Sequence, residues 1–194
     1  MASQTIEHQP APIATGWLKR YYFTRFVFSA VWVLLAFSVA RSNQPLAGIV
    51  LVSYPAWDAI ANFVDARRSG GLGSNKSQML NFIFSILTAI AVALGSSMNS
   101  VLVVFGIWAG FSGIFQLATA VGRWKSFDAQ WAMILSGAQS ALAGVFMILM
   151  AQRPDPVGIA NIAPYAAFGA FYFAVSAIWL SISDARKGGL RTAS

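Results

Sequence analysis

The sequence has 194 residues, with no cysteine, one histidine and few charged residues. Without cysteine there is no disulfide framework, zinc–thiolate site, iron–sulfur cluster or thiol nucleophile. The single histidine, His8, lies in a polar tail and leaves no histidine-based metal site or catalytic dyad. Charged residues form 10% of the chain, against about 25% in a soluble domain. We therefore exclude an ordinary cytosolic enzyme, a disordered protein and a fibrous protein, and expect no metal and no cofactor.

Hydrophobic residues form 57% of the chain and gather in long runs. A helix that crosses the hydrocarbon core of a bilayer needs roughly 20 apolar residues. The runs are apolar on every face, whereas the strands of a membrane barrel alternate between apolar and polar residues. The sequence therefore predicts an all-α integral membrane protein with six transmembrane helices, at residues 22–40, 46–64, 79–98, 101–121, 131–151 and 162–183.

The predicted organisation is a tail of residues 1–20, a six-helix membrane domain of residues 21–186 and a tail of residues 187–194. We expect no cleavable signal peptide, because residues 1–17 are polar and the first apolar run has the length of a full span. No linker between the predicted spans is long enough to separate a soluble domain. The membrane domain therefore contains all of the predicted fold.

The basic residues predict the orientation of the helices. One side of the predicted membrane domain carries Arg41 and Arg153. The other side carries Lys19, Arg20, Arg25, Arg67, Arg68, Lys76, Arg123, Lys125, Arg186, Lys187 and Arg191. By the positive-inside rule, both termini are expected in the cytosol. Topology and anionic lipids account for the net charge of +7, so we expect the lipid bilayer as the partner and no nucleic acid.

An internal repeat is present in the second, fourth and sixth predicted spans. The shared pattern is, in order, an aromatic residue, three further residues, Asp or Ser, a small residue and Ile. It occurs at residues 54–60, 108–114 and 172–178. The other three spans each place a serine partway along, at Ser29, Ser85 and Ser136. The repeat predicts three helical hairpins of roughly 55–60 residues, at about 22–64, 79–121 and 131–183. The alternative is that short matches between membrane helices arise by chance.

Two segments, residues 105–116 (FGIWAGFSGIFQ) and 135–144 (LSGAQSALAG), carry a resemblance to a known family. They resemble the HdeD-like family of small bacterial membrane proteins, which consist of short repeats of unknown biochemical function. The resemblance extends more loosely over residues 20–186, and Pro55 and Asp58 depart from the family pattern. It implies a six-helix protein of the cytoplasmic membrane with an association with acid resistance. It supplies no catalytic residues.

Four polar residues of the second predicted span, Tyr54, Asp58, Asn62 and Asp65, lie on one face of a helix. At 1.5 Å per residue, Asp58 lies roughly 10 Å further into the membrane than Asp65. A carboxylate at that depth costs a few kcal/mol, so Asp58 must face protein or water. The sequence therefore predicts that this face points into the bundle.

Two interpretations of Asp58 remain open. In one, Asp58 senses or relays protons, assisted by Asn62 and Gln116. In the other, Asp58 only forms hydrogen bonds across the bundle, to Ser112 or Ser176. The candidate intramembrane site thus consists of Asp58, Asn62, Ser112, Gln116 and Ser176.

Small residues on the fourth and fifth predicted spans indicate close helix packing. These residues are Gly106, Gly110, Gly113 and Gly144, with Ser136 and Ser140 beside them. Either packing within the chain or a homo-oligomer would use them. Pro55 is expected to kink the second span, because proline removes a backbone donor.

The expected function is that of a non-enzymatic inner-membrane protein that supports acid or envelope stress tolerance, the stress role being implied by the resemblance alone. The alternative is a small proton-linked transporter or channel that uses Asp58. We expect no enzyme activity, because the serines have no histidine or lysine base at their depth and the Gly-x-Ser-x-Gly motif is absent. We expect no soluble partner.

Overall fold

The computed structural model describes residues 13–38, 40–68, 70–74, 76–122 and 130–191. The described residues form six α-helices and two short 3₁₀ helices, without a strand. The helices are α1 (Ile13–Phe37), α2 (Gln44–Arg68), η1 (Leu72–Ser74), α3 (Lys76–Ala93), α4 (Met98–Gly122), α5 (Gln130–Ala151), η2 (Ile159–Asn161) and α6 (Ala163–Arg191). The prediction of an all-α chain with six long helices is confirmed.

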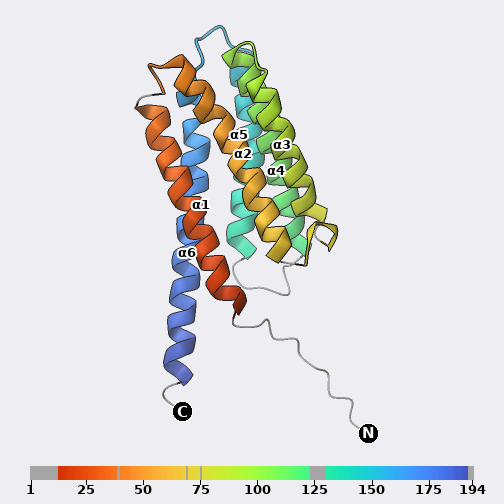
Figure 1. Ribbon diagram of the computed structural model, residues 1–194, viewed down its shortest axis with the longest axis vertical. Helices are drawn as coiled ribbons and strands as arrows, with labels where there is room; N and C mark the ends of the chain where they lie inside the picture. Colours follow the sequence, from red (N-terminus) through yellow and green to blue (C-terminus); the bar gives the residue numbers. More distant parts are fainter. Residues whose placement is uncertain (1–12, 39, 69, 75, 123–129, 192–194) are drawn as a thin grey trace.

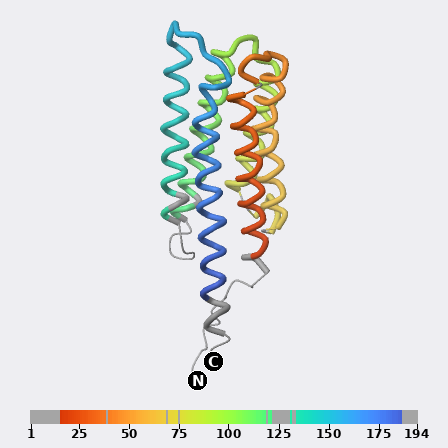
Figure 2. The backbone as a smooth tube through the Cα atoms, turned by 90° about the vertical axis from the view of Figure 1, so that its left-hand side faces the viewer, coloured from red at the N-terminus to blue at the C-terminus, as the bar shows by residue number. Residues whose placement is uncertain are grey.

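The six helices form one elongated bundle in which successive helices run in opposite directions (Figure 1). Each helix packs against the next one in the chain, and α6 packs against α1, so that the helices close into a ring (Figure 2). The start of α1 and the end of α6 therefore lie at the same end of the bundle as η1. The connections from α1 to α2, α3 to α4 and α5 to α6 lie at the opposite end.

Five of the six helices, α2 to α6, are long and apolar enough to cross a membrane. The chain is thus a multi-pass membrane protein. The helix α1 is 25 residues long, but Lys19, Arg20 and Arg25 lower its mean hydropathy. Its outward face is nevertheless apolar, because the exposed side chains include Phe23 and Leu34 at 58% and 68% exposure, with Val27 and Val31 between them.

The first and last helices are longer than the sequence predicts. The helix α1 begins at Ile13, within the predicted tail of residues 1–20, and α6 continues to Arg191, within the predicted tail of residues 187–194. An ion pair of 2.6 Å between Lys19 and Asp184 joins the two extensions. This contact links α1 and α6 beyond their most apolar stretches. Residues 1–12, 123–129 and 192–194, which include His8, Arg123 and Lys125, lie outside the described residues.

The closest helix pairs are α4 with α5, α1 with α6 and α2 with α3. The predicted hairpins at 22–64 and 131–183 correspond to α1–α2 and α5–α6, whose backbones are further apart. Large aromatic side chains fill the space between α1 and α2: the rings of Trp32 and Tyr54 are 5.0 Å apart, and those of Phe28 and Trp57 are 4.6 Å apart. Side-chain size therefore sets the spacing between α1 and α2.

The close pair α4–α5 depends on glycines at two levels. A Cβ atom on Gly106 would lie 2.7 Å from the carbonyl oxygen of Gly144, and one on Gly113 would lie 2.5 Å from that of Gly137. A Cβ on Gly144 would lie 2.7 Å from the backbone nitrogen of Gly110. The predicted packing glycines thus lie where the α4 and α5 backbones touch, which is packing within the chain.

The helix α2 continues without a break through the buried Pro55, where the sequence predicts a kink. Its inward face carries Tyr54, Asp58 and Asn62, as the spacing of these residues predicts. The helix thus continues although proline donates no backbone hydrogen bond.

Cysteine labelling in a chain without native cysteine tests the orientation. The segment η1 and the end of α5 lie at opposite ends of the bundle (Figure 1). We expect Gln152→Cys to react with a membrane-impermeant maleimide in intact cells, and Ser74→Cys to react only after lysis, because the positive-inside rule predicts that the basic end faces the cytosol. The reverse pattern would show that the termini are extracytoplasmic.

Alanine at the glycine contacts tests the α4–α5 packing. Gly144→Ala is expected to lower the free energy of unfolding in mixed micelles by about 1–3 kcal/mol, because the new Cβ meets backbone that cannot move freely. The matched control is Gly48→Ala on α2, where a Cβ would meet nothing within 4 Å. This control should raise the stability by up to about 1 kcal/mol through helix propensity. Equal effects at both sites would contradict the close approach.

Candidate functional site

The centre of the site is a carboxylate held by three helices. Asp58 of α2 is 9% exposed and forms an ion pair with Arg25 of α1 through Oδ1. Its other oxygen, Oδ2, accepts a hydrogen bond from Ser85 of α3 at 2.9 Å and one from the side chain of Asn62 at 2.8 Å. Both carboxylate oxygens therefore have partners, and one of them is a cation.

Arg25 is enclosed by aromatic groups from two helices. Its guanidinium donates to the hydroxyl of Tyr21 at 2.9 Å and lies 4.4 Å from the ring centroid of Phe173 on α6. The ring of Phe173 thus provides a cation–π contact to the guanidinium. Arg25 Nε is buried without a hydrogen-bond partner. The ion pair is thus covered by α6 and stands between α1 and α2.

The structure corrects the placement of Arg25. The sequence groups Arg25 with the basic residues at the membrane edge and leaves Asp58 without a base. Because α1 begins at Ile13, Arg25 is the middle residue of that helix and lies deep enough to reach Asp58. A basic residue in mid-helix was the available signal, since such residues within a membrane span almost always face the bundle interior and pair.

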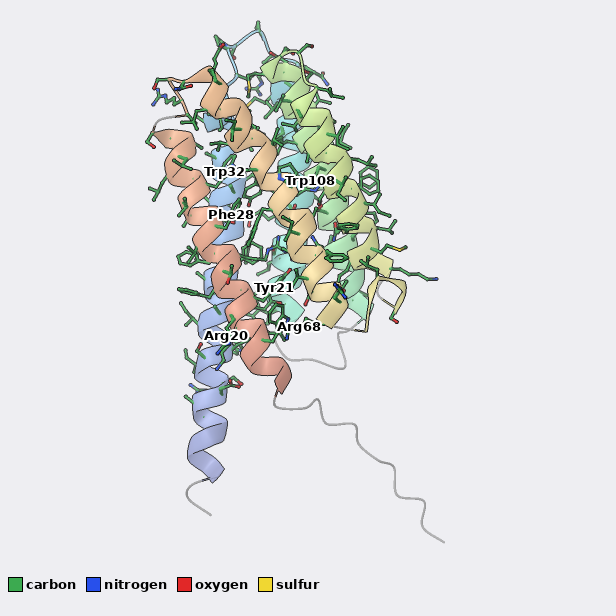
Figure 3. All side chains as sticks on the ribbon, in the orientation of Figure 1. Arg20, Tyr21, Phe28, Trp32, Arg68 and Trp108 are labelled. Atoms are coloured by element: carbon green, nitrogen blue, oxygen red, sulfur yellow. The ribbon has the colours of Figure 1, made fainter. Side chains whose placement is uncertain are left out.

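A tryptophan extends the network to a fourth helix. Trp108 of α4 donates from Nε1 to the hydroxyl oxygen of Ser85 at 2.9 Å, and Ser85, which is fully buried, donates in turn to Asp58. In Figure 3, Trp32 of α1 and Trp108 of α4 lie at similar height on either side of α2. One serine thus links α2, α3 and α4.

Three aromatic side chains from α2, α4 and α6 meet at the centre of the bundle. The ring centroids of Tyr54 and Trp108 are 6.0 Å apart, those of Trp108 and Tyr165 are 5.9 Å apart, and those of Tyr54 and Tyr165 are 6.4 Å apart. All three contacts are edge-to-face, the arrangement that the ring quadrupoles favour. The three even-numbered helices are therefore in contact through one aromatic cluster.

Each central aromatic residue has a serine neighbour on an odd-numbered helix. Ser85 accepts from Trp108 at 2.9 Å, and the hydroxyls of Ser140 and Tyr165 are 3.2 Å apart. The buried Ser29 of α1 is the corresponding neighbour of Tyr54. These serines are spaced by roughly 55 residues, as expected for three copies of one unit.

The central aromatic residue of α6 and its serine neighbour are not the residues that the sequence pattern aligns. The sequence pattern aligns Tyr172 and Ser136 with the first two copies, but the structure places Tyr165 and Ser140 at the equivalent positions. Shifts of seven and four residues keep a side chain on nearly the same helix face. The periodic pattern therefore could not distinguish these registers.

The structure brings together two of the five predicted site residues, Asp58 and Asn62. Ser112 is buried at its hydroxyl, which has no hydrogen-bond partner. Gln116 is half-buried on α4, and Ser176 is half-buried on α6. Gly169 comes four residues after Tyr165, as Asp58 comes four residues after Tyr54. Ser176 lies two turns beyond Gly169. The described hydrogen bonds of Asp58 go to Ser85 and Asn62, not to Ser112 or Ser176.

The chemistry available at the site is that of a closed polar network. Neither the surface groove between α1 and α6 nor the one at the end of α2 is lined by Asp58 or its partners. Among the described residues, no three His, Asp or Glu side chains gather to hold a metal ion. The arrangement is suited to fixing helices in one packing.

Comparison with known families gives one match. A family model described as a short repeat of unknown function (DUF308) matches residues 80–149, which contain most of α3, all of α4 and most of α5. The matched segment includes Ser85, Trp108 and the α4–α5 glycines, but not Arg25 or Asp58. No curated protein and no solved structure matches the chain.

Alanine at Ser85 tests the network. Ser85→Ala is expected to lower the free energy of unfolding by about 1–3 kcal/mol, because the Trp108 N–H loses its acceptor and Asp58 loses a donor in a buried site. Trp fluorescence during unfolding in mixed micelles measures the loss. The control is Ser38→Ala, since Ser38 is exposed and bonds only to the Leu34 carbonyl. An effect equal to that of the control would show that the network contributes no stability.

Proposed function

We propose that this chain is a non-enzymatic integral protein of the bacterial cytoplasmic membrane that supports tolerance of acid or envelope stress. The observation that carries the non-enzymatic part is the closed network around Asp58. Both oxygens of this carboxylate have donors, and its cation comes from a neighbouring helix. A group that is engaged in this way holds helices together and presents no reactive atom to a substrate.

The exposed surface of the bundle supports the proposed membrane location. Exposed apolar side chains cover every helix of the ring, with Leu34, Ile49, Leu94 and Leu142 each at least two-thirds exposed. The end of the bundle that carries the start of α1 and the end of α6 is rich in arginine and lysine, which supports cytosolic termini by the positive-inside rule. For the hypothesis of a homo-oligomer, the described residues offer no observation other than this exposed apolar surface.

The stress role rests on resemblance. Residues 105–116 and 135–144 resemble the HdeD-like family, and the DUF308 match at residues 80–149 contains both segments. The ion pair of Arg25 and Asp58 lies outside that match. We infer that the matched repeat supplies the common bundle architecture and that the pair locks the first copy of the repeat onto it.

A structural role for Asp58 agrees better with the geometry than proton carriage. A carrier carboxylate must exchange with water, whereas Asp58 is buried and is not among the residues that line the α1–α6 groove or the groove at the end of α2. Breaking a buried ion pair leaves an uncompensated charge and costs about 3–5 kcal/mol, while removing both charges can be nearly neutral. This difference separates the two roles experimentally.

The experiment measures acid survival and membrane abundance in a deletion strain that carries each variant. Asp58→Asn is expected to lower abundance several-fold, because Arg25 loses its counter-charge. The double variant Arg25→Gln with Asp58→Asn should recover both abundance and survival. Asp155→Asn, in an exposed loop, is the matched control and should match the intact protein.

Two results would contradict the proposal separately. If the double variant recovers abundance but not survival, the charges carry the function and the transporter interpretation replaces the structural one. If the deletion strain survives acid and envelope stress as well as its parent, the stress role is wrong. The membrane location is tested independently by the cysteine labels.

A further inference from the structure

A groove with a volume of about 560 Å³ runs along the outer surface between α1 and the end of α6. This volume lies within the range of about 300–1,000 Å³ that is usual for ligand sites. Figure 3 shows Arg20 where α1 and α6 run side by side. The side chains on which the argument depends are Lys19, Arg20, Phe23, Ile178, Ser181 and Ile182.

The groove changes character along its length. At the end of the bundle, Lys19 pairs with Asp184, whereas Arg20 is exposed and forms no ion pair within the part of the chain that the structure describes. One turn further into the bundle, Phe23 is 58% exposed, and Ile178 on the facing helix is 59% exposed. The groove is therefore cationic at its outer end and apolar at its inner end.

This polarity matches one molecule of the surrounding bilayer. A phospholipid carries an anionic phosphate at the headgroup level and acyl chains below it. Basic pockets between transmembrane helices on the cytoplasmic side bind anionic headgroups, and the planar guanidinium of arginine suits phosphate oxygens. We propose that the α1–α6 groove binds one anionic phospholipid, with its phosphate at Arg20 and an acyl chain along Phe23 and Ile178.

A second basic groove, at the end of α2, is a weaker candidate. Its cations are Arg67 and Arg68. The guanidinium of Arg68 lies 4.4 Å from the ring centroid of Trp17, and that of Arg67 lies 5.6 Å from the ring centroid of Phe63. Both cations already have aromatic partners, and the residues that line this groove come from one helix. Arg67 therefore serves as a control at the same end of the bundle.

The test is native mass spectrometry of the full-length protein with added phosphatidylglycerol or phosphatidylcholine. The intact protein is expected to hold one phosphatidylglycerol more tightly than phosphatidylcholine. Arg20→Gln should weaken phosphatidylglycerol binding about 5-fold, since one basic residue near anionic lipid is worth that much in affinity. Arg67→Gln and Arg153→Gln should each change it less than 2-fold, about the resolution of the measurement.

A second variant tests the apolar part without changing charge. Ser181→Phe places a ring in the groove and is expected to weaken lipid binding by a similar factor, because Ser181 is exposed and bonds only to the Ala177 carbonyl of its own helix. Ala118→Phe, on the exposed face of α4, adds the same ring elsewhere and should have no effect. Millimolar inorganic phosphate should not displace the lipid.

Several outcomes would overturn the lipid site. Equal binding of the two lipids, or equal effects of Arg20→Gln and Arg67→Gln, would show general attraction to the basic end. Displacement by inorganic phosphate would assign the site to a free anion. A dimer peak that Ser181→Phe abolishes, without a lipid adduct, would assign the groove to a second copy of the chain. None of these results bears on stress tolerance, so this proposal and the proposed function fail separately.

Discussion

The ion pair between Arg25 and Asp58 is the constraint on which the packing of the first half of the chain depends. Neither charge is tolerated alone at that depth, because an unpaired ionised side chain in hydrocarbon costs several kcal/mol. The pair therefore requires α1 to lie beside α2, while Ser85 brings α3 and Phe173 brings α6 to the same place. With these charges matched, α1 joins the bundle although it carries an arginine at its middle.

Around this pair the bundle repeats one simple contact three times. An aromatic side chain of an even-numbered helix points to the centre and meets a serine of an odd-numbered helix, with Ser85 and Ser140 as the clearest partners. Small residues then set how closely the helices approach, so that the glycines bring α4 to α5 while aromatic rings hold α1 and α2 apart. The pair α1–α2 also carries the buried charges of Arg25 and Asp58.

The outer surface follows a different rule from the interior. Apolar side chains are exposed along the helices, and the charged side chains are at the ends, where Lys19 pairs with Asp184 and Arg68 stacks on Trp17. In the interior, the polar side chains hold the helices together. At the ends of the bundle, the charged side chains lie where the lipid headgroups are expected.

Composition and periodicity alone determined the all-α class, the six long helices and the inward face of α2, because a bilayer imposes span length and requires polar groups to face inward. They also singled out Asp58, Asn62 and the glycines of α4 and α5. Only the tertiary structure decided that Arg25 reaches Asp58, that Ser85 rather than Ser112 or Ser176 completes the site, and that Tyr165 rather than Tyr172 stands at the centre. Positions four or seven residues apart share a helix face, so their depth and partners are fixed only when neighbouring helices pack against them.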